Sequence, residues 1–277
     1  MSDADLIKKW QRELRWHRRA DSLPTPIRRA VASLYRQRPT ARLDRRGHQE
    51  RARLAEQILV RCAGTVQRGP FAGMVFPFAT WDAPAKCIGS YECELHDEVE
   101  RIFEREYWAV INVGCAEGYY AIGLARAMPG ALMYAYDTDP EAIAKCKQLA
   151  EANTVPPDRL KLGGEVTHQV LDELCRPNSL VIVDIEGGEA ALLDPASAPH
   201  LAQVDLLIEL HHNVVPNIEQ VLRQRFARTH SIRSVDSEPR IDASRYPELD
   251  GLTPHEQALA MFERPIVMRW LILESTR

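Results

Sequence analysis

Trp108-Ala-Val-Ile-Asn-Val-Gly-Cys-Ala-Glu-Gly118 is the stretch that decides the fold of this chain. The mostly apolar run 108–113 predicts a short buried parallel strand. The five residues after it predict a tight turn, and 119–128 predict the helix that follows. Such a strand–turn–helix unit brings backbone N–H groups and a positive helix end close to a ligand. The stretch therefore predicts a ligand site.

A second predicted strand, 131–136, is followed directly by an acidic residue, Asp137. Asp137 lies 23 residues after Gly114, the separation at which a β-α-β unit sets a carboxylate against a ribose diol. The glycine spacing is G-x-x-x-G, with Ala116 in the middle and Tyr119 directly after the turn. A dinucleotide site needs G-x-G-x-x-G. The pattern therefore predicts a nucleoside cofactor without a pyrophosphate and disfavours a nicotinamide oxidoreductase.

Three motifs in order carry a family resemblance. The glycine turn resembles the first motif of class I S-adenosylmethionine (SAM) methyltransferases. Leu180-Val-Ile-Val-Asp-Ile-Glu-Gly-Gly-Glu189 and Leu206-Leu-Ile-Glu-Leu-His211 resemble the fourth- and fifth-strand motifs of FkbM-type methyltransferases. The resemblance covers roughly residue 66 to the C-terminus. Two departures are Asn112, where an acid is usual, and Ala116, where glycine is frequent, so the amino-acid end of the cofactor is expected to be held differently.

The resemblance implies an α/β, Rossmann-like class I methyltransferase fold. It has a mainly parallel seven-stranded sheet flanked by helices, with the last strand antiparallel, and an N-terminal helical extension. The later strands are predicted at 160–162, 180–184, 204–210, 229–235 and 266–274, and helices at 140–152, 166–174 and 217–226. Residues 236–253 are predicted to be a long loop, and a substrate lid is one of two interpretations left open.

Charge divides the chain. Residues 1–61 carry 16 Lys and Arg against 7 Asp and Glu, whereas the remainder carries 19 against 32. We therefore predict a basic α-helical extension over 1–64, with helices at about 3–20, from Pro26, and at 47–63. Residues 65–107 are predicted as a hairpin (66–78), an irregular stretch (81–90) and a lid helix (91–106), before a SAM-binding domain over 108–277. The basic faces fit a solvated surface, a clamp on the acidic body or a nucleic-acid surface.

The composition limits the class of protein to which the chain can belong. An apolar content of 45% and a charged content of 27% are ordinary for a globular protein. There is no apolar run long enough for a membrane span and no signal core at the start, so we expect a cytoplasmic protein without a membrane partner. Six cysteines without metal-ligand spacing are expected to be reduced thiols. A homo-oligomer is left open.

The predicted site lies where the carboxyl ends of the parallel strands meet. Asp137 is expected to accept the ribose hydroxyls, and Glu165 to meet the adenine unless it is a solvated loop acid. By the resemblance, Tyr91 covers the cofactor, although it also suits a plain helix start. The predicted cofactor-binding residues are Tyr91, Gly114, Cys115, Ala116, Glu117, Gly118, Tyr119, Asp137, Thr138, Glu165, Val166 and Asp184.

Methyl transfer to oxygen or nitrogen requires a group that takes a proton from the acceptor. Asp184, Glu186 and His211 are the predicted catalytic residues, because a carboxylate after an apolar strand and an imidazole both suit a base. Two alternatives remain open. One is a divalent metal held by Asp184 and Glu209. The other is that Glu209 and His211 form only a hydrogen bond that joins two strand ends. The metal-free version is preferred, because the motif supplies only two nearby acids.

The resulting hypothesis is a SAM-dependent methyltransferase. The resemblance alone implies O-methylation of a small-molecule acceptor such as a sugar or secondary metabolite, and a nucleic-acid partner is not expected. The alternatives are a nucleic-acid methyltransferase that uses the basic N-terminal helices, and a non-catalytic SAM-binding scaffold.

Overall fold

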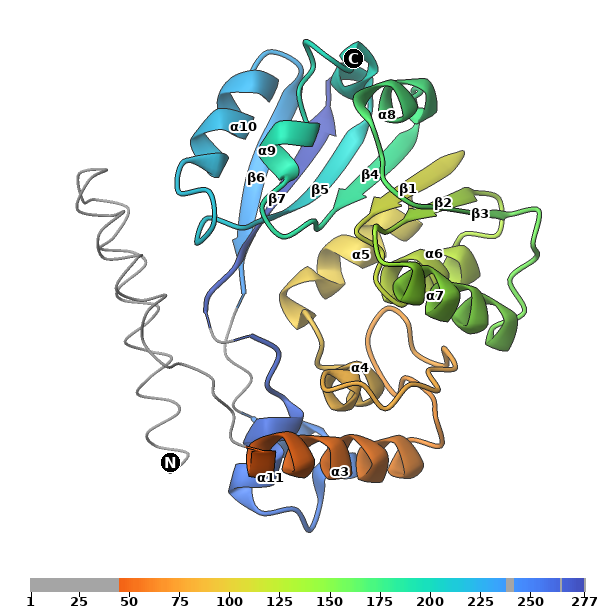
Figure 1. The fold of residues 1–277 in the computed structure, drawn as a ribbon, viewed down its shortest axis with the longest axis vertical. Coiled ribbons are helices and arrows are strands. Elements are labelled where there is room, and N and C mark those ends of the chain that lie inside the picture. The colour runs from red at the N-terminus through yellow and green to blue at the C-terminus, as the bar shows by residue number, and fades with distance from the viewer. Residues whose placement is uncertain (1–44, 238–241, 265, 277) are drawn as a thin grey trace. The chain divides into compact units, whose positions relative to one another are not determined.

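The structure is a computed structural model that describes residues 45–237, 242–264 and 266–276. The helices predicted at 3–20 and from Pro26 lie outside the described residues. Contacts divide the chain into two compact units (Figure 1). The first is Met1–Glu94 with Ser237–Val267, and the second is Leu95–Asp236 with Met268–Arg277. The sequence had assigned 237–267 to the SAM-binding domain, whereas its contacts gather with the N-terminal unit.

The second unit is built on one seven-stranded sheet in the order β3-β2-β1-β4-β5-β7-β6. The strands are β1 (Ala109–Val113), β2 (Leu132–Tyr136), β3 (Leu160–Gly163), β4 (Ser179–Val183), β5 (Asp205–Leu210), β6 (His230–Asp236) and β7 (Arg269–Ser275). β1 to β5 pair in parallel, and β7 runs antiparallel to both β5 and β6. The predicted fold class, including the antiparallel last strand, is confirmed.

Helices cover the sheet (Figure 1). They are α5 (His96–Phe103), α6 (Tyr119–Ala127), α7 (Pro140–Ala152), α8 (His168–Leu174), α9 (Glu189–Leu192) and α10 (Ile218–Phe226), with a 3-10 turn at Pro199–Gln203. Alternate residues of β1 face opposite sides. Ile111 and Val113 join the core formed with Leu171 of α8 and Phe226 of α10. Asn112 therefore faces the other side.

Local sequence signals explain the first β-α-β unit. All five residues of β1 are buried, as expected for a strand covered on both faces. Gly118 caps α6 at φ +93°, and a Cβ there would lie 2.6 Å from the Sγ of Cys146. Asp139 caps α7 by accepting the N–H of Glu141 at 2.8 Å, with Pro140 in the first turn. These signals place the glycine turn and Asp137 next to each other.

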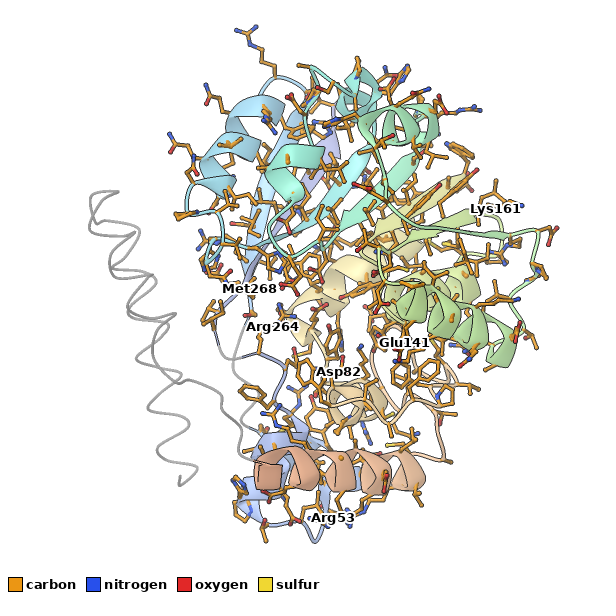
Figure 2. The ribbon with its side chains drawn as sticks, in the orientation of Figure 1. Arg53, Asp82, Glu141, Lys161, Arg264 and Met268 are labelled. Atoms are coloured by element: carbon orange, nitrogen blue, oxygen red, sulfur yellow. The ribbon has the colours of Figure 1, made fainter. Side chains whose placement is uncertain are left out.

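The first unit contains α3 (Arg45–Arg61), α4 (Ala83–Ile88) and α11 (Pro254–Ala260). Arg53, labelled on α3 in Figure 2, pairs with Glu256 at 2.5 Å. Arg61 donates to the backbone oxygens of Glu248 and Asp250 at 2.7 and 2.9 Å. Among the described basic residues, these arginines therefore act as a clamp on the segment between β6 and β7.

Four local predictions need correction. The hairpin predicted at 66–78 is shorter than a pair of regular strands: Thr65 and Val75 form an antiparallel bridge, and Val66 exchanges backbone hydrogen bonds with Gly73 and Met74. The stretch 81–90, predicted to be irregular, contains α4. The helix predicted from Tyr91 begins later, as a 3-10 turn at Cys93–Leu95 followed by α5. The long loop 236–253 carries the 3-10 turns Ala243–Arg245 and Pro247–Leu249 and leads directly into α11.

Two expectations from composition can be compared with the described chain. Across residues 45–237, 242–264 and 266–276, no helix has both the length and the apolar character needed to cross a membrane. All six cysteines are free thiols, and five of them are buried.

Candidate functional site

A cleft of about 630 Å³ opens at the carboxyl ends of β1 to β4, within the second unit. Its lining comes from the four turns that follow these strands and from α9. The lining residues are Val113, Gly114, Tyr136, Asp137, Thr138, Gly164, Glu165, Val166, Thr167, His168, Asp184, Ile185, Glu186, Gly188, Ala191 and Leu192. This is the edge of the sheet at which the sequence placed the ligand.

Backbone hydrogen bonds hold the glycine turn in place, two of them to the end of β2. The N–H groups of Gly114 and Cys115 both donate to the carbonyl of Tyr136, at 2.8 and 2.9 Å, and Gly118 donates to Cys115 at 2.8 Å. These N–H groups are therefore used within the chain, which suits a ligand without a phosphate. At Gly114, φ is +79° and a Cβ would lie 1.7 Å from the carbonyl oxygen of Asp184. Only glycine allows this contact between the β1 turn and the β4 turn.

Asp137 bridges two backbone groups at the end of β2. Its Oδ2 accepts the N–H of Ala116 at 2.9 Å, and its Oδ1 accepts the N–H of Asp139 at 2.9 Å. Each carboxylate oxygen has further lone pairs, and the residue lines the cleft. Asp137 is thus fixed by the glycine turn and can still accept hydrogen bonds from a ligand.

The predicted cofactor residues fall into three groups. Those that line the cleft are Gly114, Asp137, Thr138, Glu165, Val166 and Asp184. Cys115, Glu117 and Tyr119 are buried, and with Ala116 and Gly118 they form the turn and the helix start but do not line the cleft. Tyr91 belongs to the first unit, where the Nζ of Lys86 lies 4.8 Å from the centre of its ring. Its role as a lid stays a prediction.

The three predicted catalytic residues are close together. The Nε2 atom of His211, just after β5, lies 3.6 Å from Asp184 Oδ1 and 3.2 Å from Glu186 Oε2. Glu209 Oε2 is 3.9 Å from the same nitrogen. The imidazole side chain is only 5% exposed, whereas that of Glu186 is 88% exposed. The two motifs therefore meet at the cleft rim, with a buried imidazole beneath the carboxylates.

Glu189, which was not predicted as a site residue, holds this arrangement together. Its side chain is fully buried, and Oε1 lies 2.6 Å from Nδ1 of His211. The same oxygen accepts the backbone N–H groups of Ile185 and Gly187, at 3.3 and 3.1 Å. The only signal in the sequence was an acid three residues after Glu186, and its burial depends on the fold.

The electrostatic surroundings change the proton affinity of His211. Burial by itself lowers the pKa of the imidazole. The hydrogen bonds to Glu186 and Glu189, with the charges of Glu189 and Asp184, outweigh burial and raise that pKa to about 10. In the metal-free chain His211 is therefore an imidazolium at neutral pH. An imidazole with an ordinary pKa would suit a base, but His211 has a raised pKa, so the carboxylates suit the proton-accepting role better.

The residues present fit SAM. Asn112 Oδ1 is buried and has no hydrogen-bond partner among the described residues. An orphaned acceptor two residues before the glycine turn suits a ligand that carries an amino group. Asp137 suits a ribose, and the apolar side chains of Val166, Ile185 and Leu192 line the same cleft and suit an aromatic base.

Comparisons with known proteins place methyltransferases among the similar structures. No protein-family model and no curated protein sequence matches the chain. An rRNA methylase from Streptococcus thermophilus is 14% identical, with a TM-score of 0.44 over 66% of this chain and 98% of that one. An O-methyltransferase from Bacillus cereus in complex with SAH is 12% identical, with a TM-score of 0.43 over 63% and 78%. A precorrin-6y C5,15-methyltransferase from Geobacter metallireducens is 11% identical, with a TM-score of 0.45 over 65% and 88%.

Proposed function

We propose that this chain is a SAM-dependent methyltransferase of FkbM-like type that methylates an oxygen of a small molecule such as a sugar or secondary metabolite. One observation carries the proposal. A single cleft gathers the glycine turn, Asp137 after β2 and the acids Asp184 and Glu186 after β4. A ribose-binding acid beside a cluster of ionisable groups is the combination that a nucleoside-dependent enzyme needs. The choice of oxygen and of a small acceptor rests on the sequence resemblance alone.

The chain's own residues can perform the remaining chemistry. When bound, SAM supplies a methyl group on a sulfonium, and transfer to an acceptor hydroxyl releases one proton. Asp184 and Glu186 line the cleft and are the groups that can take this proton. Nε2 of the His211 imidazolium lies 3.2 Å from Glu186 Oε2, within hydrogen-bond distance, and 3.6 Å from Asp184 Oδ1, where its charge attracts the carboxylate.

Binding tests the cofactor. Calorimetry should show micromolar affinity for SAM and no binding of NAD. Asp137→Ala should weaken SAM binding by ~1.5–3 kcal/mol, because it removes charge-assisted hydrogen bonds to the ribose, which corresponds to ~10- to 100-fold in Kd. Asp139→Ala is the matched control, since Asp139 caps α7 and does not line the cleft. Tight NAD binding without SAM binding, or equal affinity of Asp137→Ala and the parent, would contradict the proposal.

Two further measurements separate the alternatives. A scaffold binds SAM but releases no S-adenosylhomocysteine when small-molecule fractions are added, whereas an enzyme releases it. A nucleic-acid methyltransferase binds RNA or DNA with an affinity that falls steeply with salt. Two of the arginines of α3, Arg53 and Arg61, contact the segment between β6 and β7, and we expect weak nucleic-acid binding at physiological salt.

A further inference from the structure

The end of β4 and the end of β5 bring three metal-ligating side chains to one point. Asp184, Glu186 and His211 each offer one ligand atom, and these atoms lie within 4.8 Å of one another. The Nε2 atom of His211 is 3.2 Å from Glu186 Oε2 and 3.6 Å from Asp184 Oδ1. Ligand atoms that share an ion at bond lengths of ~2.0–2.2 Å lie ~3.0–3.6 Å apart. Both distances from Nε2 therefore fit a common ion with little movement.

The imidazole is oriented from behind by a buried carboxylate. Nδ1 of His211 lies 2.6 Å from Oε1 of Glu189, whose side chain is fully buried. A carboxylate on one ring nitrogen, with the other nitrogen directed at a cluster of acids, is the arrangement that metal-binding histidines use to fix ring orientation and raise ligand basicity. This feature distinguishes the site from a group of surface acids, because His211 is itself 95% buried.

The charge of the site also matches a cation. Asp184, Glu186 and Glu209 have carboxylate oxygens within 3.9 Å of Nε2 of His211, and Glu189 contacts its other nitrogen. A single proton on the imidazole offsets one of these negative charges. A divalent ion offsets two, and it can also be bonded directly by the carboxylates. The mixed oxygen and nitrogen ligand set suits a first-row ion such as Mn²⁺ better than Ca²⁺.

We propose that Asp184, Glu186 and His211 bind one divalent first-row metal ion, with Glu189 as the positioning residue for His211. Metal binding stands on this geometry, whereas its use rests on the proposed function: an ion at the cleft rim would orient an acceptor hydroxyl and lower its pKa. With the ion bound, Asp184 and Glu186 are its ligands, and the proton-accepting role proposed for them applies to the metal-free chain. The sequence favoured a metal-free site because Ile185 and Gly187-Gly188 leave only two nearby acids in the motif after β4. The fold adds His211 as a third ligand, and the buried Glu189 orients its ring.

The test uses the full chain, stripped with chelator and titrated with Mn²⁺ alone. Electron paramagnetic resonance of free Mn²⁺ and calorimetry should show one ion per chain with micromolar Kd. Glu186→Gln should weaken binding at least tenfold, and its exposed position leaves folding intact. Glu189→Gln should weaken binding ~10- to 100-fold, as loss of a supporting carboxylate does. Glu141→Gln is the matched control, since this acid, in the first turn of α7, is not one of the residues that line the cleft, and it should leave binding unchanged.

Two results would overturn the proposal. One is the absence of stoichiometric binding of Mn²⁺, with Mg²⁺ and Zn²⁺ also failing as substitutes. The other is equal Mn²⁺ affinity in the parent, Glu186→Gln and Glu189→Gln. SAM binding is measured in parallel on the same chelator-treated protein. Loss of SAM binding alone argues against the methyltransferase, whereas loss of Mn²⁺ binding alone argues against the metal site.

Discussion

Replacing Gly114 by alanine is expected to lower the free energy of unfolding by ~2–5 kcal/mol. The residue has φ +79°, and a side chain in this left-handed conformation costs ~1–2 kcal/mol. The new Cβ would also lie 1.7 Å from the carbonyl oxygen and 2.7 Å from the carbonyl carbon of Asp184. The β4 turn must then move away, and such overpacking costs a further ~1–3 kcal/mol.

Urea unfolding monitored by circular dichroism measures this loss. Gly130→Ala is the matched control, because nothing lies within 4 Å of a Cβ there and φ is not positive. Its effect should stay within ~1 kcal/mol and can be stabilising. Because Gly114→Ala displaces Asp184, it should also weaken SAM and Mn²⁺ binding, which Gly130→Ala should not. A loss below ~1 kcal/mol for Gly114→Ala, or equal losses for the two variants, would refute the reasoning.

Two more predictions concern ionic interactions. In chelator-treated protein the pKa of His211 is raised from 6.5 to about 10, so the stability that its proton contributes is complete below pH 6.5 and is lost as the pH rises through about 10. Nitrogen-15 NMR of the ring should show an imidazolium at pH 8, and a midpoint near 6.5 would contradict this. Arg53→Ala should cost at most ~1 kcal/mol in urea unfolding, because its pair with Glu256 is solvent-exposed on the arginine side; a loss above ~2 kcal/mol would show that the contact is more than a surface ion pair.

The strands and helices of the second unit could be predicted because their signals are local. The run before Gly114 is short and apolar, and the helix at Pro140–Ala152 has an Asp cap and a proline in its first turn. The predicted bounds of this helix agree with α7 to the residue. The acid after β2 was found by its distance from Gly114, because a β-α-β unit of fixed length leaves little freedom in where the second strand ends.

The error at α4 arose because burial removes the amphipathic pattern of the helix. Every residue of α4 is buried, so no polar face marks it as a helix. Its remaining signals were Pro84 in the first turn and Gly89 at the C-cap, with φ +77°.

The start of α11 carries a capping box, in which Thr253 and Glu256 cap each other. That box stood at the edge of the predicted long loop, and it marks a helix start.

The site shows a different limit, since it depends on residues that meet only after folding. Asp184 and His211 were predicted to share a rim because parallel neighbours end together, and β4 and β5 do pair in parallel. Nothing in the spacing of Glu189 indicates that it lies under His211. That contact requires the turn after β4 to fold back, with Gly187 at φ +108°, where a Cβ would lie 2.7 Å from Val214.

One carboxylate oxygen therefore links the parts of the site. Oε1 of Glu189 accepts two backbone N–H groups of the turn that carries Asp184 and Glu186, and it contacts the imidazole that follows β5. The turn and the imidazole cannot be repositioned independently, because moving either leaves a buried carboxylate with fewer hydrogen bonds. The close approach of Gly187 to Val214 fixes the same turn from the other side. The geometry of Asp184, Glu186 and His211 is thus set before any ligand binds, which is what a site for orienting an ion or an acceptor requires.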